Sequence, residues 1–118
     1  MGDSFQGVKT ITLQPGSATV PFAFTFAACS SATANDGSIP YGTTISSAAI
    51  KAFDETGTDR TAEMVASETN TATVLTINLK YPATTGAGRY SLEMVVTLDS
   101  GAVMEFDFTR VYAKDISA

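Results

Sequence analysis

The sequence predicts one all-β domain, an antiparallel β-sandwich of about seven strands. Short segments alternate between apolar and polar residues, and clusters of Gly, Pro, Asn, Asp and Ser separate them, whereas no long segment has helical periodicity. Alternation gives each strand one buried and one solvated face, which two packed sheets provide. The 118 residues suffice for a single domain with its own core. A small β-barrel is the main alternative.

The clearest element is a β-hairpin between Arg89 and Tyr112, whose two alternating runs flank the loop Asp99-Ser100-Gly101. Gly101 stands where a three-residue loop needs a left-handed residue. A two-residue loop would set apolar residues against acidic ones, so we predict the three-residue loop. The facing pairs are then Leu98 and Ala102, Val96 and Met104, Met94 and Phe106, and Leu92 and Phe108.

Five further strands are expected where the same alternation is weaker. They cover residues 8–13, 20–26, 45–53, 62–65 and 73–79. The predicted inward residues are Ile11 and Leu13, then Val20, Phe22, Phe24 and Phe26, then Thr73, Leu75, Ile77 and Leu79. Pro21 has no N–H to donate, so it should lie at a strand start or on an open edge. In the 45–53 strand the set Ala48, Ile50 and Ala52 competes with Ala49, Lys51 and Phe53 for the inner face.

Turn residues predict how these strands connect. Residues 54–59 should form a polar turn that makes a second hairpin with residues 62–65. Residues 68–71 should form the next turn, and residues 82–88 should lead into the final hairpin.

Two segments have no strand pattern. Residues 1–6 are expected to be disordered, and Ala27–Thr44 is expected to be a long loop of small and polar residues. Loops of this length are usually functional or mobile, and composition leaves a mobile or packing role open beside a binding role. If the loop binds a partner, we expect it to order on binding.

Composition excludes several function classes. The net charge is −5 with no basic cluster, so nucleic acid is not an expected partner. Histidine is absent and Cys29 is the single cysteine, which excludes histidine-based catalysis, an internal disulfide and thiolate zinc sites. No apolar run is long enough to span a membrane, and the first residues lack the basic and apolar regions of a signal peptide. We therefore expect no enzyme activity, no cofactor and no membrane partner.

Carboxylates are the remaining candidates for chemistry. In the hairpin register Glu93 lies opposite Asp107, with Glu105 diagonal to both, and opposed like charges are unfavourable. Either a basic neighbour compensates, for which Lys80 is the candidate, or a cation or basic partner surface binds there. Glu93, Glu105 and Asp107 are thus weak metal-site candidates.

Two other charged features have simpler interpretations. Asp54, Glu55 and Asp59 share a turn but lack the spacing of a calcium loop, so a solvated turn is expected. Arg110 falls in the apolar register opposite Tyr90, where its stem could pack while the guanidinium reaches solvent or an acidic partner.

One part of the sequence resembles a known group of proteins. The segments Lys80-Tyr81-Pro82, Gly88-Arg89-Tyr90-Ser91-Leu92, Leu98-Asp99-Ser100-Gly101 and Glu105-Phe106-Asp107-Phe108-Thr109-Arg110 carry it. They resemble short immunoglobulin-like domains encoded by tailed bacteriophages and prophages, in particular the last hairpin of the N-terminal domain of phage baseplate upper proteins. The resemblance covers about the last third of the chain.

The resemblance implies an immunoglobulin-like sandwich and a non-enzymatic virion component. Such a protein would act by self-assembly or by docking onto other virion structural proteins, and would reside in the virion or, before assembly, in the host cytoplasm. The alternative is an adhesin-like or carbohydrate-binding sandwich at a cell surface. Tyr41 and Tyr81 are the aromatic residues expected to be available outside a clear strand, and sugar binding would depend on them.

Overall fold

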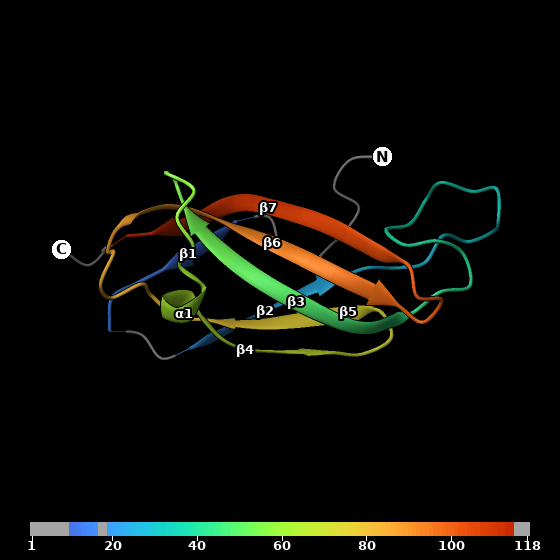
Figure 1. Ribbon diagram of the computed structural model, residues 1–118, viewed down its shortest axis with the longest axis horizontal. Helices are drawn as coiled ribbons and strands as arrows, with labels where there is room; N and C mark the ends of the chain where they lie inside the picture. Colours follow the sequence, from blue (N-terminus) through green and yellow to red (C-terminus); the bar gives the residue numbers. More distant parts are fainter. Residues whose placement is uncertain (1–9, 17–18, 115–118) are drawn as a thin grey trace.

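The structure, a computed structural model, describes residues 10–16 and 19–114, and it contains two β-sheets packed face to face (Figure 1). One sheet has four strands in the order β1-β7-β6-β3, and the other has three in the order β2-β5-β4. The elements are β1 (Ile11–Leu13), β2 (Val20–Thr25), β3 (Ile45–Asp54), α1 (Thr61–Met64), β4 (Val65–Asn70), β5 (Val74–Leu79), β6 (Gly88–Leu98) and β7 (Val103–Ala113). The predicted all-β sandwich is confirmed.

The strand order is that of an immunoglobulin-like domain. Lettered A to G along the chain, the sheets contain A-G-F-C and B-E-D, and the grouping of C, F and G against B, E and D defines that fold. All strand pairs are antiparallel except β1 and β7, which run parallel with Ile11 opposite Val111. The expected disorder of residues 1–6 and the start of the 8–13 strand lie outside the described residues.

The hairpin of β6 and β7 has the predicted register. Leu92 pairs with Phe108, Met94 with Phe106 and Val96 with Met104. The Leu98 N–H donates to the Ala102 carbonyl at 2.8 Å, and Gly101 has a φ of 91°, as a three-residue loop requires. The large apolar side chains of β6 consequently point between the sheets.

Because of a β-bulge, Arg110 does not lie where the sequence predicts it. The register shifts between Tyr90 and Leu92, so Tyr90 faces Val111 and not Arg110. An extra residue on one strand turns the following side chains to the opposite face. Val111 is fully buried, while Arg110 is exposed and does not interrupt the apolar stripe.

Aromatic pairs connect the two sheets. Phe24 on β2 meets Phe108 on β7 edge to face with ring centroids 5.3 Å apart, and Phe26 meets Phe106 at 4.8 Å. Phe22 is only half-buried, so the predicted stripe of β2 is correct at its C-terminal end. Pro21 lies on β2, which is an edge strand of its sheet, as its missing N–H requires.

The strand β3 buries Ile50 and Ala52, which settles the face that the sequence left open. Its partner, however, is β6, and the predicted second hairpin is wrong. Residues after β3 form the one-turn helix α1 and then cross to the other sheet, where β4 pairs with β5. The predicted turn at residues 68–71 is also misplaced, because β4 extends to Asn70.

Tyr90, at the start of β6, forms a hydrogen bond typical of immunoglobulin-like domains. Its Oη donates to the carbonyl of Gly86 at 2.6 Å, and its side chain is 2% exposed. A tyrosine that bonds the backbone a few residues upstream at this corner is a hallmark of the fold. Gly88-Arg89-Tyr90, part of the segment that carries the phage resemblance, contains this tyrosine.

We expect Tyr90→Phe to lower the free energy of unfolding by about 1 kcal/mol, because the half-buried Gly86 carbonyl loses its hydrogen-bond donor. Urea unfolding followed by circular dichroism measures this change. Tyr112→Phe is the matched control, since the Tyr112 hydroxyl makes no hydrogen bond within the described residues. Equal losses in the two variants would contradict a specific role for the Tyr90 hydroxyl.

Candidate functional site

Three loops meet at one end of the sandwich (Figure 1, right). They are residues 27–44, 71–73 and 99–101. The Asp99 N–H donates to the Thr44 carbonyl at 2.9 Å, and the Thr44 N–H donates to Asp99 Oδ1 at 3.1 Å. The Ile45 N–H donates to the Ala72 carbonyl at 2.8 Å. The loops are therefore fixed to one another where they leave the sheets, and together they form a surface that we call the loop end.

The long loop is closed at its base by backbone pairing. Ala28 and Ile39 form an isolated parallel bridge, the Cys29 N–H donates to the Ile39 carbonyl at 2.9 Å, and the Ser38 N–H donates to the Ala27 carbonyl at 2.7 Å. Ile39 is 1% exposed and belongs to the core. Although the sequence shows no strand period here, the loop is attached to the sandwich at both ends.

A second connection crosses the middle of the loop. Asp36 accepts a hydrogen bond from the Ser30 N–H at 2.9 Å and another from the Ser30 hydroxyl at 2.7 Å. These bonds stabilise the carboxylate and hold the pKa of Asp36 below its ordinary value. Sequence reasoning missed this pair, because Ser and Asp six residues apart give no recognisable pattern.

A hollow of about 280 Å³ opens inside the loop. Its lining consists of Cys29, Ser31, Ala32, Ala34, Asn35, Gly37, Ser38, Ile39, Pro40, Tyr41 and, from β7, Met104. Tyr41 is 58% exposed, whereas Tyr81, the other candidate aromatic, is half-buried against the core. Cys29 is half-buried and is a free cysteine.

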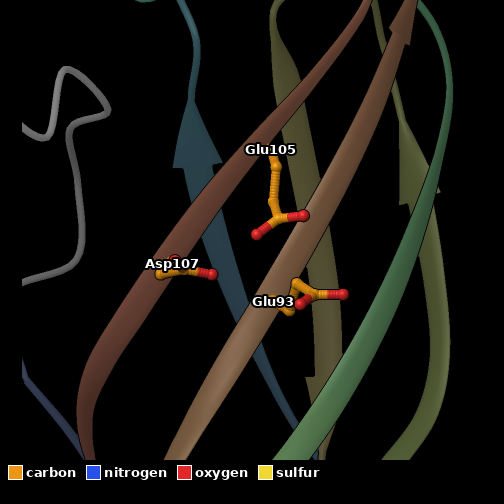
Figure 2. Close-up of side chains that lie close together, drawn as sticks. All are labelled: Glu93, Glu105 and Asp107. Atoms are coloured by element: carbon orange, nitrogen blue, oxygen red, sulfur yellow. The ribbon is translucent and has the colours of Figure 1, made fainter.

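The predicted acidic cluster lies on the outer face of the four-stranded sheet. Glu93 pairs with Asp107, and oxygen atoms of Glu93, Glu105 and Asp107 lie within 4.8 Å of one another. Figure 2 shows the three side chains on one side of the sheet, with Glu105 directed toward the other two. Whether they hold a cation stays a prediction.

The prediction that Lys80 is the basic neighbour of the acidic cluster is wrong. Lys80 follows β5, which belongs to the other sheet, so it does not flank the cluster. Lys51 on β3 is the cross-strand neighbour of Glu93. The cluster makes no ion pair within the part of the chain that the structure describes, so mutual repulsion is only partly offset.

We expect Asp107→Asn to raise the midpoint of thermal unfolding at low salt, because it removes a negative charge directly opposite Glu93. High salt should shrink the gain through screening. Glu68→Gln, which removes the same charge from the exposed strand β4, should change the midpoint less. A large increase of the wild-type midpoint in millimolar Ca²⁺, lost in Asp107→Asn, would instead identify a cation site.

At the opposite end of the sandwich, Asp54 organises the turn after β3. Its Oδ1 accepts hydrogen bonds from the Thr56 N–H at 2.9 Å and the Thr58 N–H at 3.0 Å, and its Oδ2 accepts one from Arg60 Nε at 2.9 Å. Asp59 accepts a hydrogen bond from the Thr61 N–H at 2.8 Å, and in the described part of the chain Asp54, Glu55 and Asp59 do not bring their carboxylate oxygens together into one group. The predicted solvated turn is thus an ordered one.

The same network reaches the segment before β6. Arg60 Nη1 lies 3.6 Å from Glu63 Oε2, and Glu63 accepts hydrogen bonds from the Thr85 N–H at 3.0 Å and the Thr85 hydroxyl at 2.7 Å. Hydrogen bonding, from Thr56 to Asp54 and from Thr85 to Glu63, lowers the pKa of both carboxyl groups.

These lowered pKa values predict acid lability. Both carboxylates stabilise the fold above the pKa values of the unfolded chain, which are about 4, and this stabilisation is lost as pH falls below them. We expect the thermal midpoint to fall from pH 5 to pH 3 and to fall less in the double variant Asp54→Asn and Glu63→Gln. The same pH dependence in wild type and variant would contradict the assignment.

Comparison of the chain with protein-family models, with curated proteins and with solved structures gives no match. The fold alone therefore defines the class of protein: it is an immunoglobulin-like sandwich with a structured loop end. The one helix in the described residues, α1, has four residues, so no described helix is long enough to cross a membrane.

Proposed function

We propose that the protein is a non-enzymatic binding module that contacts other proteins through its loop end. One observation carries this proposal. The two most exposed large apolar side chains of the described residues, Tyr41 at 58% and Val103 at 63%, both lie at this end. Aromatic residues are enriched at protein interaction sites and are among those that contribute most of the binding energy.

The loop end has the position of a known type of binding surface. In immunoglobulin variable domains, the loops between strands B and C and between F and G contact the ligand. Here the same loops are residues 27–44 and 99–101, and they are hydrogen-bonded to each other. A surface that is already ordered loses less conformational entropy on binding.

We further propose that the partners are structural proteins of a phage or prophage particle, or further copies of this chain. The support is the resemblance of residues 80–110 to phage immunoglobulin-like domains. The protein would then act in the virion, after a period in the host cytoplasm before assembly.

Photocrosslinking tests two parts of the proposal together: the loop end as the binding surface and the virion as the location. A photoreactive phenylalanine analogue replaces Tyr41, or replaces Ala83, which is exposed at the opposite end of the sandwich. Particles are purified from the cells that encode the chain, irradiated and analysed by mass spectrometry. The proposal predicts that the chain is found in particles and that Tyr41 crosslinks to one virion protein whereas Ala83 does not. Absence from particles would refute the virion role, and equal crosslinking from both positions would refute the loop end.

The alternative is a carbohydrate-binding sandwich, in which Tyr41 would stack on a sugar ring. Tyr41 is the only exposed large aromatic side chain in the part of the chain that the structure describes, whereas a sugar platform usually uses several. A glycan array decides between the two: we expect no ligand, and a glycan whose binding is lost in Tyr41→Ala would establish the alternative.

A further inference from the structure

The hollow in the long loop has the size of a side-chain pocket. Its volume is about 280 Å³, and an apolar cavity of about 150 Å³ in another protein is enough to admit benzene. The hollow therefore has room for one phenol or indole ring, and it is smaller than most pockets that bind a complete drug-sized molecule.

The chemistry of the lining favours an uncharged aromatic ring. None of the eleven lining residues carries a charge, so the lining offers a charged side chain no ion-pair partner. The Tyr41 ring and the Met104 thioether both contact aromatic rings favourably. Asn35, also in the lining, is exposed and makes no hydrogen bond within the described residues, so its amide is available to a phenol hydroxyl or an indole N–H.

Hydrogen bonds within the loop hold the hollow open. The bridge between Ala28 and Ile39 closes one side of the loop, and the two hydrogen bonds between Ser30 and Asp36 hold its middle. Gly37 is buried against the opposite backbone and leaves no space for the loop to collapse there. A pocket held open in this way can bind a rigid ring at a low entropic cost.

We propose that this hollow is the anchor pocket of the loop end and that it takes one uncharged aromatic side chain, tryptophan or tyrosine, from the partner protein. The inference rests on the proposed function, because it names what the loop end recognises.

Amide chemical-shift mapping of the full chain tests the pocket without a known partner. The probes are N-acetyl-L-tryptophanamide and N-acetyl-L-tyrosinamide, and N-acetyl-L-lysinamide is the charged control. We expect the aromatic probes at millimolar concentration to shift amide resonances of residues 29–41 and of Met104, and the lysine probe to leave them unchanged. Absence of aromatic shifts, or equal shifts with the lysine probe, would overturn the proposal.

Pocket-filling variants supply the matched comparison. Ala34→Leu places a larger side chain in the lining and should abolish the shifts, whereas Thr33→Leu, one residue away and outside the lining, should retain them. Ala32→Leu repeats the test in case Ala34→Leu does not fold, which the core amide resonances report. If the filled variant still crosslinks through Tyr41 to the same partner, the anchor pocket is refuted while the binding function stands.

Discussion

Met94→Ala is expected to lower the free energy of unfolding by about 3 kcal/mol, the largest loss of any substitution considered for this chain. Met94 lies on β6 with 0% exposure and faces Phe106 across the hairpin. Truncation removes apolar atoms from the centre of the sandwich and leaves a cavity that neighbouring strands cannot fill without breaking their own pairing. Urea unfolding should show a lower midpoint at an unchanged slope.

Val95→Ala is the control for Met94→Ala. Val95 is the next residue on β6, but it faces the outer side of the sheet opposite Glu105 and is only half-buried. Its loss of stability should be clearly smaller. Equal effects at the two positions would mean that β6 does not present alternate faces to core and solvent.

Gly37→Ala should produce the second largest loss, about 2 kcal/mol. A Cβ at this position would lie 2.5 Å from the Ala27 carbonyl oxygen and 2.6 Å from the Cys29 nitrogen. Both atoms belong to backbone that is paired with Ile39 or Ser38, so neither can move without breaking the base of the loop. We expect the amide resonances of residues 27–41 to shift, together with a lower urea midpoint.

Gly88→Ala separates this clash from the general effect of replacing glycine. A Cβ at Gly88 would have its nearest neighbour at 3.7 Å, an ordinary van der Waals distance. Gly88→Ala should therefore be nearly neutral. If Gly37→Ala were equally neutral, the close backbone approach in the loop would be wrong.

The hairpin of β6 and β7 could be predicted from sequence because the residues that determine its register are close together in the chain. Large residues alternate on both sides of a loop that ends in Gly101, and one register alone matches them. The bulge near Tyr90 leaves no such signal in the sequence, so strict alternation predicts the wrong face for Arg110. Without the bulge, alternation puts Arg110 in the inward register of Phe108 and Val111 on the outer face.

Connections between sheets could not be predicted from local pattern. The turn that begins at Asp54 looks like a hairpin turn, but its side-chain bonds to Thr56 and Thr58 and the short helix α1 direct the chain to the other sheet. Lys51 and Glu93 are neighbours because β3 pairs with β6, a distant strand in sequence. The prediction that Lys80 flanks Glu93 is wrong for this reason.

Only part of the loop end could be predicted. The length and composition of residues 27–44 indicated a loop with a possible binding role, and Tyr41 was recognised as an available aromatic residue. The hollow depends on Gly37 packing against residues 27–29 and on Met104 from β7. These are tertiary contacts between segments far apart in the sequence or between small residues, and local alternation predicts neither.

The pairing of β6 with β7 is the claim on which both the core and the position of the loop end depend. Nuclear Overhauser effects between Hα atoms test it directly, because Hα atoms of non-hydrogen-bonded antiparallel pairs lie close together. The account predicts strong effects between Val95 and Glu105 and between Glu93 and Asp107. A strong effect between Val96 and Glu105 would contradict it, since that register would turn the acidic residues of β7 toward the apolar stripe of β6.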